Sequence, residues 1–367
     1  MMPTLFDPIN LGSISCKNRI FMAPLTRGRA THTHIPSDLM VEHYRQRAHA
    51  GVIFSEATGI SQQGLGVPYA PGIWNEEQMA GWRKVTEAVH NEGGKIVLQL
   101  WHMGRVAHSS FNQGRRPVSA SATTSPGHGH TYHGNEEYET ARALSEDEIR
   151  DVVQQYGAAA RNGMHVGFDG VQVHAANGYL IDQFLRDYSN FRKDQYGGSI
   201  DNRIRFLSQV VEEVVSEVGK DLVGVRLSPN GEILGVNDSD PAELFTRAAQ
   251  RLSEIGIAYL EVREAPPGEF MLSSDTAQIH PRMREVFDGL FIMNSDFDLT
   301  RGQESLANGE ADAISYGRPF ISNPNLPEVF QRGLSPVPSN PQTYYSLGAE
   351  GYVDYPDVQA DAPSRES

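Results

Sequence analysis

Three polar side chains, His174, Asn177 and Tyr179, lie close together in the segment Val-His-Ala-Ala-Asn-Gly-Tyr-Leu at positions 173–180. The apolar run before them is typical of a buried strand, and a helix is expected to follow. His174 and Asn177 are three positions apart, so one helical turn would point both side chains the same way. Two hydrogen-bond donors and a phenol at a strand's carboxyl end could bind an oxygen and supply a proton. The alternative is hydrogen bonding within the core.

The pattern along the chain predicts the elements that position these residues. Capping signals mark several helix starts, as at Ser145 with Glu148 and at Asp240 with Pro241. The expected strands are Arg19–Ala23, Gly51–Ala57, Lys95–Leu100, Gly170–His174, Leu222–Leu227, Ile257–Val262, Leu290–Met293 and Ala313–Tyr316. The expected helices are Asp38–Ala50, Asn75–Glu92, Ser145–Asn162, Ile200–Val218, Pro241–Ile255, Pro281–Val286, Thr300–Asn308 and Asn325–Gly333, several of which end at a glycine (Gly163, Gly219 and Gly256).

This alternation of apolar strands and helices indicates a parallel sheet covered on both faces. A single (β/α)8 TIM barrel is the preferred α/β fold, and an open, doubly wound sheet is the alternative. Residues 1–356 are expected to form the barrel domain, with the segment before Arg19 as an N-terminal cap. Residues 107–143 are expected to be a long excursion after strand 3, a loop or lid over one face. Residues 357–367 are expected to form a disordered tail.

Composition excludes several classes of protein. The 367 residues carry a formal net charge of −15, which argues against nucleic acid and against an anionic membrane surface. No stretch approaches the ~20 apolar residues of a membrane span. The single cysteine, Cys16, excludes an internal disulfide framework and an iron–sulfur cluster, and is expected to be inert. Because we find no signal peptide, we expect a cytoplasmic protein. The sequence leaves both a monomer and a homodimer open.

Polar residues follow almost every expected strand, at the end of the barrel where active sites lie in this fold. The pair Gly317-Arg318, between a strand and a helix, suits a phosphate. Arg226 needs an anionic partner, either a ligand or an acid such as Glu56. Gln99 and Thr26 suit the edge of a flat heterocycle, and the alternatives are a hydrogen bond within the barrel and a turn hydroxyl.

Three histidines in the excursion, His128, His130 and His133, are conceivable metal ligands. A solvated loop is the preferred interpretation, and no metal is expected.

Eight sequence blocks occur in order over nearly the whole chain. They are F-M-A-P-L-T-R (21–27), E-A-T-G-I-S (56–61), L-Q-L-W-H-M-G-R (98–105), H-A-A-N-G-Y-L-I-D-Q-F-L (174–185), Y-G-G-S-I-D-N-R-I-R-F (196–206), V-R-L-S-P (225–229), S-Y-G-R-P-F-I-S-N-P-N-L (315–326) and G-A-E-G-Y-V-D-Y-P (348–356). Each block alone is modest evidence, but in this order they strongly resemble the Old Yellow Enzyme family of ene-reductases.

The resemblance implies FMN bound at the barrel mouth. It implies a reaction in which NAD(P)H reduces the flavin and leaves, and an activated alkene then takes its place. The alkene would be an α,β-unsaturated carbonyl or nitro compound. The cofactor-binding residues implied are Pro24, Leu25, Thr26, Ala57, Gln99, Arg226, Asn294, Ser295, Gly317 and Arg318, with Arg226 near flavin N1 and the last four at the phosphate.

The resemblance also implies the catalytic roles. His174 and Asn177 would hydrogen-bond the carbonyl or nitro oxygen, and Tyr179 would protonate the α-carbon from the face opposite the hydride. The substrate pocket would be shaped by Trp101, Tyr345 and Val67, the last of which lies where many members have a tyrosine.

Two segments depart from the family pattern. Many relatives have a glycine-rich sequence after strand 7, where this chain has Met-Asn-Ser-Asp-Phe at 293–297. Asp296 would be unfavourable beside a phosphate unless it points away. The segment Arg263–Gly268 matches no known role.

Other functions on the same barrel fit less well. A flavin 2-hydroxy-acid oxidase would need a histidine after strand 7 or 8, and the iron–sulfur dienoyl-thioester reductases need a cysteine cluster; this chain has neither. A catalytically silent, flavin-binding barrel is the non-enzymatic alternative. The intact His174, Asn177 and Tyr179 argue against it.

Overall fold

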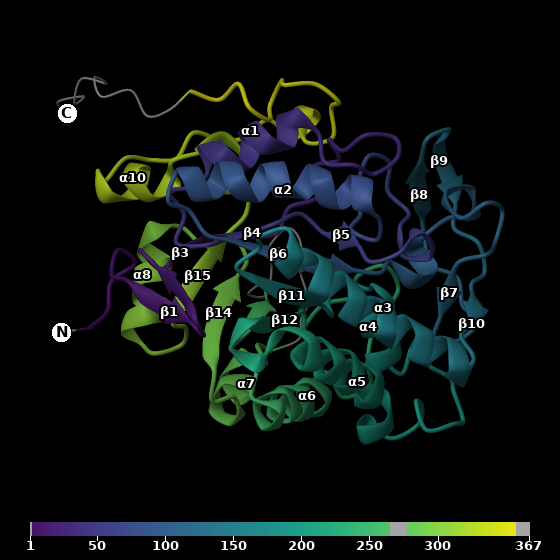
Figure 1. Ribbon diagram of the computed structural model, residues 1–367. Coiled ribbons are helices and arrows are strands. Elements are labelled where there is room, and N and C mark those ends of the chain that lie inside the picture. Colours follow the sequence, from purple (N-terminus) through teal and green to yellow (C-terminus); the bar gives the residue numbers. More distant parts are fainter. Residues whose placement is uncertain (1, 265–276, 357–367) are drawn as a thin grey trace.

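A computed structural model describes residues 2–264 and 277–356 of the chain. Its centre is a closed ring of eight parallel strands with helices outside them (Figure 1). The barrel strands are β3 (Ile20–Met22), β4 (Ile53–Phe54), β6 (Ile96–Trp101), β11 (Gly170–His174), β12 (Val223–Leu227), β13 (Tyr259–Arg263), β14 (Leu290–Asn294) and β15 (Ala313–Tyr316). Each pairs with the next along the chain, and β15 pairs with β3 to close the ring. The predicted (β/α)8 barrel is therefore confirmed, and the open sheet is excluded.

The second expected strand, Gly51–Ala57, is shorter than predicted and forms only β4. A further short strand that was not predicted, β5 (Thr58–Gly59), follows Ala57, and both β4 and β5 are parallel to β6. Between them the Ser55 hydroxyl accepts the backbone N–H of Gln99 at 3.0 Å. The Ser55 hydroxyl thus takes the place of a backbone carbonyl as acceptor between the two strands. The regular pairing with β6 is interrupted there, near the barrel rim.

Helices cover the outside of the barrel (Figure 1). They are α1 (Asp38–Gln46), α2 (Glu76–Asn91), α3 (Glu146–His165), α4 (Leu180–Leu185), α5 (Ile200–Val218), α6 (Pro241–Ile255), α7 (His280–Val286), α8 (Leu299–Ala307), α9 (Arg318–Ser322) and α10 (Leu326–Gln331). The expected capping box of Ser145 and Glu148 starts α3, and Asp240 caps α6 ahead of Pro241. Among the described residues, no helix is long and apolar enough to cross a membrane.

Gly163 does not end α3, contrary to the expectation from sequence. The helix continues to His165, and Val166 is its C-cap residue. A Cβ atom at Gly163 would lie 2.6 Å from Leu98 Cδ2, so this glycine allows the helix to pack closely on β6. Gly219 and Gly256, by contrast, do follow the last residues of α5 and α6.

The N-terminal cap is an antiparallel hairpin of β1 (Ile9–Leu11) and β2 (Ile14–Cys16). Its apolar residues pack with those at the amino ends of the barrel strands, including Phe21, Val97 and Tyr259. Cys16 is buried in this cluster, and burial raises its pKa to about 12. A thiol with so high a pKa is a poor nucleophile, which supports the interpretation of Cys16 as inert.

The excursion after β6 is partly ordered into strands. Its elements are β7 (Val118–Ser119), the hairpin of β8 (His128–Thr131) and β9 (Gly134–Glu137), and β10 (Arg142–Ala143), which pairs with β7. Tyr132 at the hairpin tip contacts Tyr69 and stacks on His32. The described residues contain no cluster of side chains suited to a metal ion, so His128, His130 and His133 form no such site there.

Inside the barrel, a glycine packs directly against a tyrosine ring. Gly224 in β12 lies beside Tyr259 in β13, and a Cβ atom at position 224 would overlap the tyrosine ring. We expect Gly224→Ala to lower the free energy of unfolding by about 1–3 kcal/mol, the usual cost of overpacking a core. Urea denaturation measures this. Gly348→Ala, at an exposed glycine with no close neighbours, is the matched control. An equal change in both variants would contradict the packing argument.

Candidate active site

The predicted site residues gather at the carboxyl-terminal rim of the barrel. His174 and Asn294 end their strands, Gln99 and Arg226 lie near the ends of theirs, and the others follow directly. The residues just beyond strand ends are Pro24, Leu25 and Thr26 after β3, Ala57 after β4, Asn177 and Tyr179 after β11, Ser295 after β14, and Gly317 and Arg318 after β15. One rim therefore carries side chains from almost every strand, as the sequence predicted.

His174 is a buried, neutral imidazole. Its Nδ1 lies 3.3 Å from the backbone N–H of Ala176, which can only donate, so Nδ1 is the acceptor and the ring proton is on Nε2. Burial, together with the charges of Arg226 and Arg263, lowers the pKa of His174 well below its ordinary value. His174 therefore presents one N–H donor and no charge at neutral pH.

Tyr179 packs between two rings. Its centroid lies 5.0 Å from those of Trp101 and His174, edge-to-face with both. Burial raises the pKa of Tyr179 above the ordinary value for a phenol. The hydroxyl thus keeps its proton throughout the physiological pH range, and gives it only to a strong base.

Asn177 is held by its backbone and its side chain. Its φ is 58°, in the left-handed region, and its N–H donates to Ser228 Oγ at 2.8 Å. Arg263 Nη1 donates to its Oδ1 at 2.6 Å. The expected helical turn from His174 to Asn177 does not form, because α4 begins only at Leu180. The chain instead turns at Asn177 and Gly178, both of which have positive φ values.

Two residues of α4 hold this turn in place through hydrogen bonds. Asp182 accepts the N–H of Gly178 at 2.9 Å. Gln183 donates to the carbonyl oxygens of Gly178 and Met103 at 2.8 and 3.0 Å. Gln183 thereby connects the turn after β11 to the loop after β6. Trp101 is the last residue of β6, just before this loop.

The buried Arg226 pairs with Glu261, not with Glu56. Arg226 Nη1 lies 2.6 Å from Glu261 Oε1, and Nη2 donates to Asn294 Oδ1 at 2.7 Å. Glu56 instead accepts from Tyr44 and from the backbone N–H groups of Arg27 and Gly28. Glu261 could have been found in the sequence, since it is an acid inside the expected strand Ile257–Val262, as Glu56 is inside the expected strand Gly51–Ala57.

One polar atom of this cluster lacks a partner. Arg226 Nε is buried, and no acceptor lies within reach among the residues that the structure describes. A buried N–H without an acceptor is costly, and an acceptor on a ligand would satisfy it.

A chain of side-chain amides joins Gln99 to the same acid. Gln99 Nε2 donates to Gln172 Oε1, and Gln172 Nε2 donates to Glu261 Oε2, both at 2.8 Å. The carboxylate accepts only, so it fixes the direction of both amides. The hydrogen bond of Gln99 within the barrel is therefore present, and the Gln99 Oε1 atom remains as an acceptor.

The turn after β14 is strained and carries an acid. Ser295 and Asp296 both have positive φ values, 150° and 40°, which glycine would adopt more easily. Asp296 does not point away from the expected phosphate residues, because its carboxylate pairs with Arg318. The Asn294 side chain is bonded to Arg226 and to the carbonyl of Ser315, so both its polar atoms are occupied.

The apolar cluster around Trp101 contains residues that were not predicted from the sequence. Trp101 and the partly buried Val67 and Tyr179 pack in one cluster with Tyr138 and Leu234. Tyr138 comes from the end of the excursion and Leu234 from the loop after β12, and neither lies near a recognisable motif.

Tyr345, which was expected in the pocket, is 65% exposed. Its segment is held by Arg29, which donates to the carbonyl oxygens of Thr343 and Tyr344.

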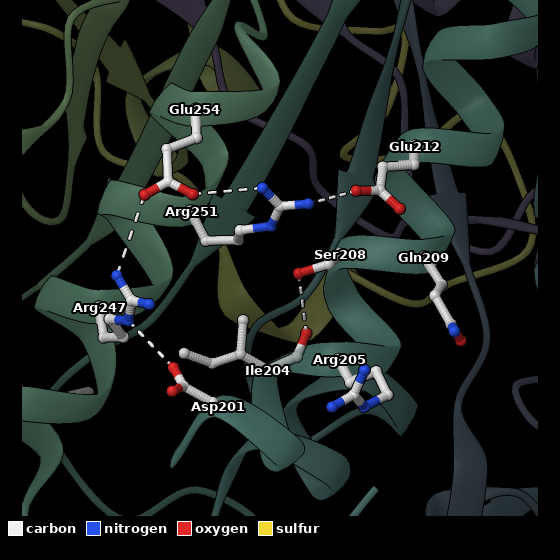
Figure 2. A pocket seen from close by; sticks show the side chains of 9 residues that line it. All are labelled: Asp201, Ile204, Arg205, Ser208, Gln209, Glu212, Arg247, Arg251 and Glu254. Atoms are coloured by element: carbon white, nitrogen blue, oxygen red, sulfur yellow. Dashed lines mark hydrogen bonds and ion pairs between the residues drawn. The ribbon is translucent and has the colours of Figure 1, made fainter. Parts of the chain in front are cut away.

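A separate hollow lies on the outer face of the barrel, between α5 and α6 (Figure 2). Its charged side chains pair with one another: Arg247 with Asp201 at 3.0 Å and Arg251 with Glu254 at 3.2 Å. It is formed by two helices outside the barrel, whereas the predicted site residues lie at the carboxyl ends of the strands. The rim is therefore the stronger candidate for the active site.

Comparisons with known proteins agree with this architecture. Residues 4–336 match the model of the NADH:flavin oxidoreductase / NADH oxidase family, whose members bind FMN. A probable flavin mononucleotide-dependent alkene reductase of Leishmania infantum is 38% identical over 361 residues, covering 96% of this chain and 97% of that protein.

Two solved structures are similar throughout. An old yellow enzyme homologue from Zymomonas mobilis has 51% identity and a TM-score of 0.95, covering 96% of this chain and 99% of that one. Morphinone reductase in complex with tetrahydroNAD has 43% identity and a TM-score of 0.91, covering 98% of each chain. Taken with the rim described above, these matches show that the chain belongs to the Old Yellow Enzyme family of FMN-dependent alkene reductases.

Proposed function

We propose that this protein takes hydride from NADH or NADPH onto FMN and reduces the C=C bond of alkenes activated by a carbonyl or nitro group. The observation that carries the proposal is the turn after β11, where a neutral imidazole donor and a protonated phenol are in edge-to-face contact and the amide of Asn177 lies between them in the sequence. The tetrahydroNAD bound to morphinone reductase supports a nicotinamide as hydride donor.

The residues at the rim fit FMN. Its isoalloxazine carries acceptors at N1 and the neighbouring carbonyl, which suit the unpartnered Nε–H of Arg226. Gln99 Oε1 would accept from a ring N–H, and Thr26 would donate to a ring carbonyl. Pro24, Leu25 and Ala57 would contact the ring system, and Gly317, Arg318 and the turn at Asn294 and Ser295 would hold the phosphate. When bound, FMN supplies the hydride that the alkene receives.

His174 and Asn177 would bind the activating oxygen of the alkene. Both can donate while neutral, so the developing negative charge on that oxygen is stabilised without any loss of a proton from the protein. Their donors are held in place before substrate arrives, by Ala176 for His174 and by Ser228 and Arg263 for Asn177. Trp101 and Val67 would form the walls beside the C=C bond, and Tyr345 would lie at the entrance.

Tyr179 would protonate the α-carbon. Its raised pKa makes it a weak acid, but the carbanion that forms there is far more basic, so proton transfer is downhill. Tyr179 would regain its proton from water.

The proposal is tested by anaerobic turnover. Purified protein loaded with FMN is mixed with NADPH or NADH, and 2-cyclohexenone is then added. We expect nicotinamide oxidation to depend on the enone, and to form one cyclohexanone for each nicotinamide consumed. Protein that takes up no FMN, or that oxidises NAD(P)H without forming cyclohexanone, would refute the proposal.

Asp296 is expected to weaken FMN binding. Its carboxylate competes with the phosphate for Arg318, whose side chain is 45% exposed. We expect Asp296→Asn to tighten FMN binding about fivefold, the effect of removing a like charge worth ~1 kcal/mol in water. The gain should shrink at high salt. Fluorescence titration of FMN measures it, with Glu304→Gln, an exposed acid on α8, as the control for net charge. Weaker binding by Asp296→Asn would show instead that Asp296 orients Arg318 for the phosphate.

A further inference from the structure

Arg263 ends β13 and makes a short, charged hydrogen bond to Asn177. The distance from Arg263 Nη1 to Asn177 Oδ1 is 2.6 Å, and Arg263 is partly buried. Burial and the nearby Arg226 lower the pKa of Arg263 to about 10, so the guanidinium remains charged at neutral pH. The Arg226 charge is balanced by Glu261 at 2.6 Å. The bond between Arg263 and Asn177 is thus one from a cation to a neutral amide.

This bond determines which way the Asn177 amide faces. A side-chain amide has an acceptor oxygen on one side and a donor NH2 on the other, whereas a guanidinium only donates. Rotating the amide by half a turn would bring N–H groups against N–H groups and lose a charge-assisted bond. The Asn177 NH2 group is therefore held on the side away from Arg263.

The backbone of Asn177 is fixed separately. Its N–H is bonded to Ser228 Oγ, and its φ is 58°. Arg263 consequently restricts the rotation of the side chain, including the bond that turns the amide. Without this bond, the amide could rotate and would present its oxygen to the substrate part of the time. That oxygen would repel the activating oxygen of the substrate.

We propose that Arg263 is a positioning residue for alkene reduction, which turns the Asn177 amide so that its NH2 group donates to the activating oxygen of the substrate. This inference rests on the proposed function of Asn177. The guanidinium also polarises the amide it binds, which strengthens the hydrogen bond that the NH2 group makes on its other side.

The test is a double-mutant cycle on the FMN-loaded enzyme, with phenol as the probe. Phenol presents an oxygen like that of the enolate, and its binding is followed by the flavin absorbance without turnover. We expect Arg263→Met to weaken phenol binding about 10-fold to 100-fold, the range for losing a hydrogen bond to a charged group. In the Asn177→Ala background, the same substitution should change the affinity less than about twofold.

Arg263→Lys separates positioning from folding. It keeps one charged donor, and we expect it to recover most of the affinity lost in Arg263→Met. Equal phenol affinity in wild type and Arg263→Met would overturn the proposal. So would effects of Arg263→Met and Asn177→Ala that multiply in the double variant, because Arg263 would then act on the ligand directly.

A second measurement distinguishes this inference from the proposed function. Chemically reduced enzyme is mixed with 2-cyclohexenone, and flavin reoxidation is followed. If wild type reoxidises and Arg263→Met does so equally fast at every enone concentration, the role of Arg263 is wrong. If wild type itself does not reoxidise, the proposed function fails, whatever the phenol titrations give.

Discussion

Tyr179→Phe should slow flavin reoxidation by 2-cyclohexenone about 10²-fold to 10⁴-fold, and should leave flavin reduction by NAD(P)H unchanged. The substitution removes the hydroxyl but keeps the ring, so the edge-to-face contacts with Trp101 and His174 persist. The size of the effect is that of a lost general acid. Only the step that reduces the alkene needs this proton. Stopped-flow measurement of the two half-reactions separates them.

Tyr156→Phe is the matched control for this experiment. Tyr156 is a buried tyrosine on α3, outside the site, and its hydroxyl has no partner among the residues described. We expect it to change neither half-reaction. If Tyr179→Phe slowed both half-reactions equally, its role would be in binding or packing. If it slowed neither, another group would be the proton donor.

Arg226→Met should have the largest effect on both stability and cofactor binding. It leaves the carboxylate of Glu261 buried without its cation, which costs about 3–5 kcal/mol of the free energy of unfolding. It also removes the Nε–H donor that fits the flavin, so FMN binding should weaken. Urea denaturation at two FMN concentrations separates the loss of intrinsic stability from the loss contributed by the ligand.

The double variant Arg226→Met with Glu261→Gln distinguishes these two effects. Neutralising the acid should recover most of the stability, because a buried amide costs less than a buried charge. FMN affinity should stay low, since the cation is still missing. Recovery of both properties would show that Arg226 serves only to balance Glu261. Recovery of neither would mean that the ion pair is not what destabilises the single variant.

The barrel was predictable because its signals are local. Each strand is an apolar run, and helix starts carry capping residues such as Ser145 and Asp240. The β8–β9 hairpin was missed because its sequence is polar and rich in glycine and histidine. It is held by backbone pairing and by a turn at Gly134, whose φ is 108°. Its two strands lack the alternation of apolar and polar residues from which a strand is usually predicted.

The site residues that follow the strands were predictable because they lie in recognisable local motifs. The acids that form ion pairs with them were harder to predict. Nothing near Arg226 in the sequence identifies Glu261 as its partner. Asp296 was expected near the phosphate residues, but its pairing with Arg318 depends on how the neighbouring strands β14 and β15 align. A partial signal did exist in β13. Glu261 and Arg263 are two positions apart in an apolar strand, so both side chains point to the same face. Two charges on one face of a barrel strand indicate a polar interior or a site.

The segment Arg263–Gly268, which matched no role in the sequence, is now partly explained. Arg263 bonds to Asn177, and Glu264 accepts the backbone N–H groups of Ile279 and His280 where α7 begins. Positions 265–268 lie outside the residues described, as does the expected tail at 357–367.

The most direct test of the central claim is a single turnover without nicotinamide. The FMN-loaded protein is reduced with dithionite under anaerobic conditions, mixed with 2-cyclohexenone, and followed by the flavin absorbance. The account predicts complete reoxidation at a rate that saturates with enone concentration, and one cyclohexanone for each flavin. A flavin that stays reduced until oxygen is admitted would contradict it.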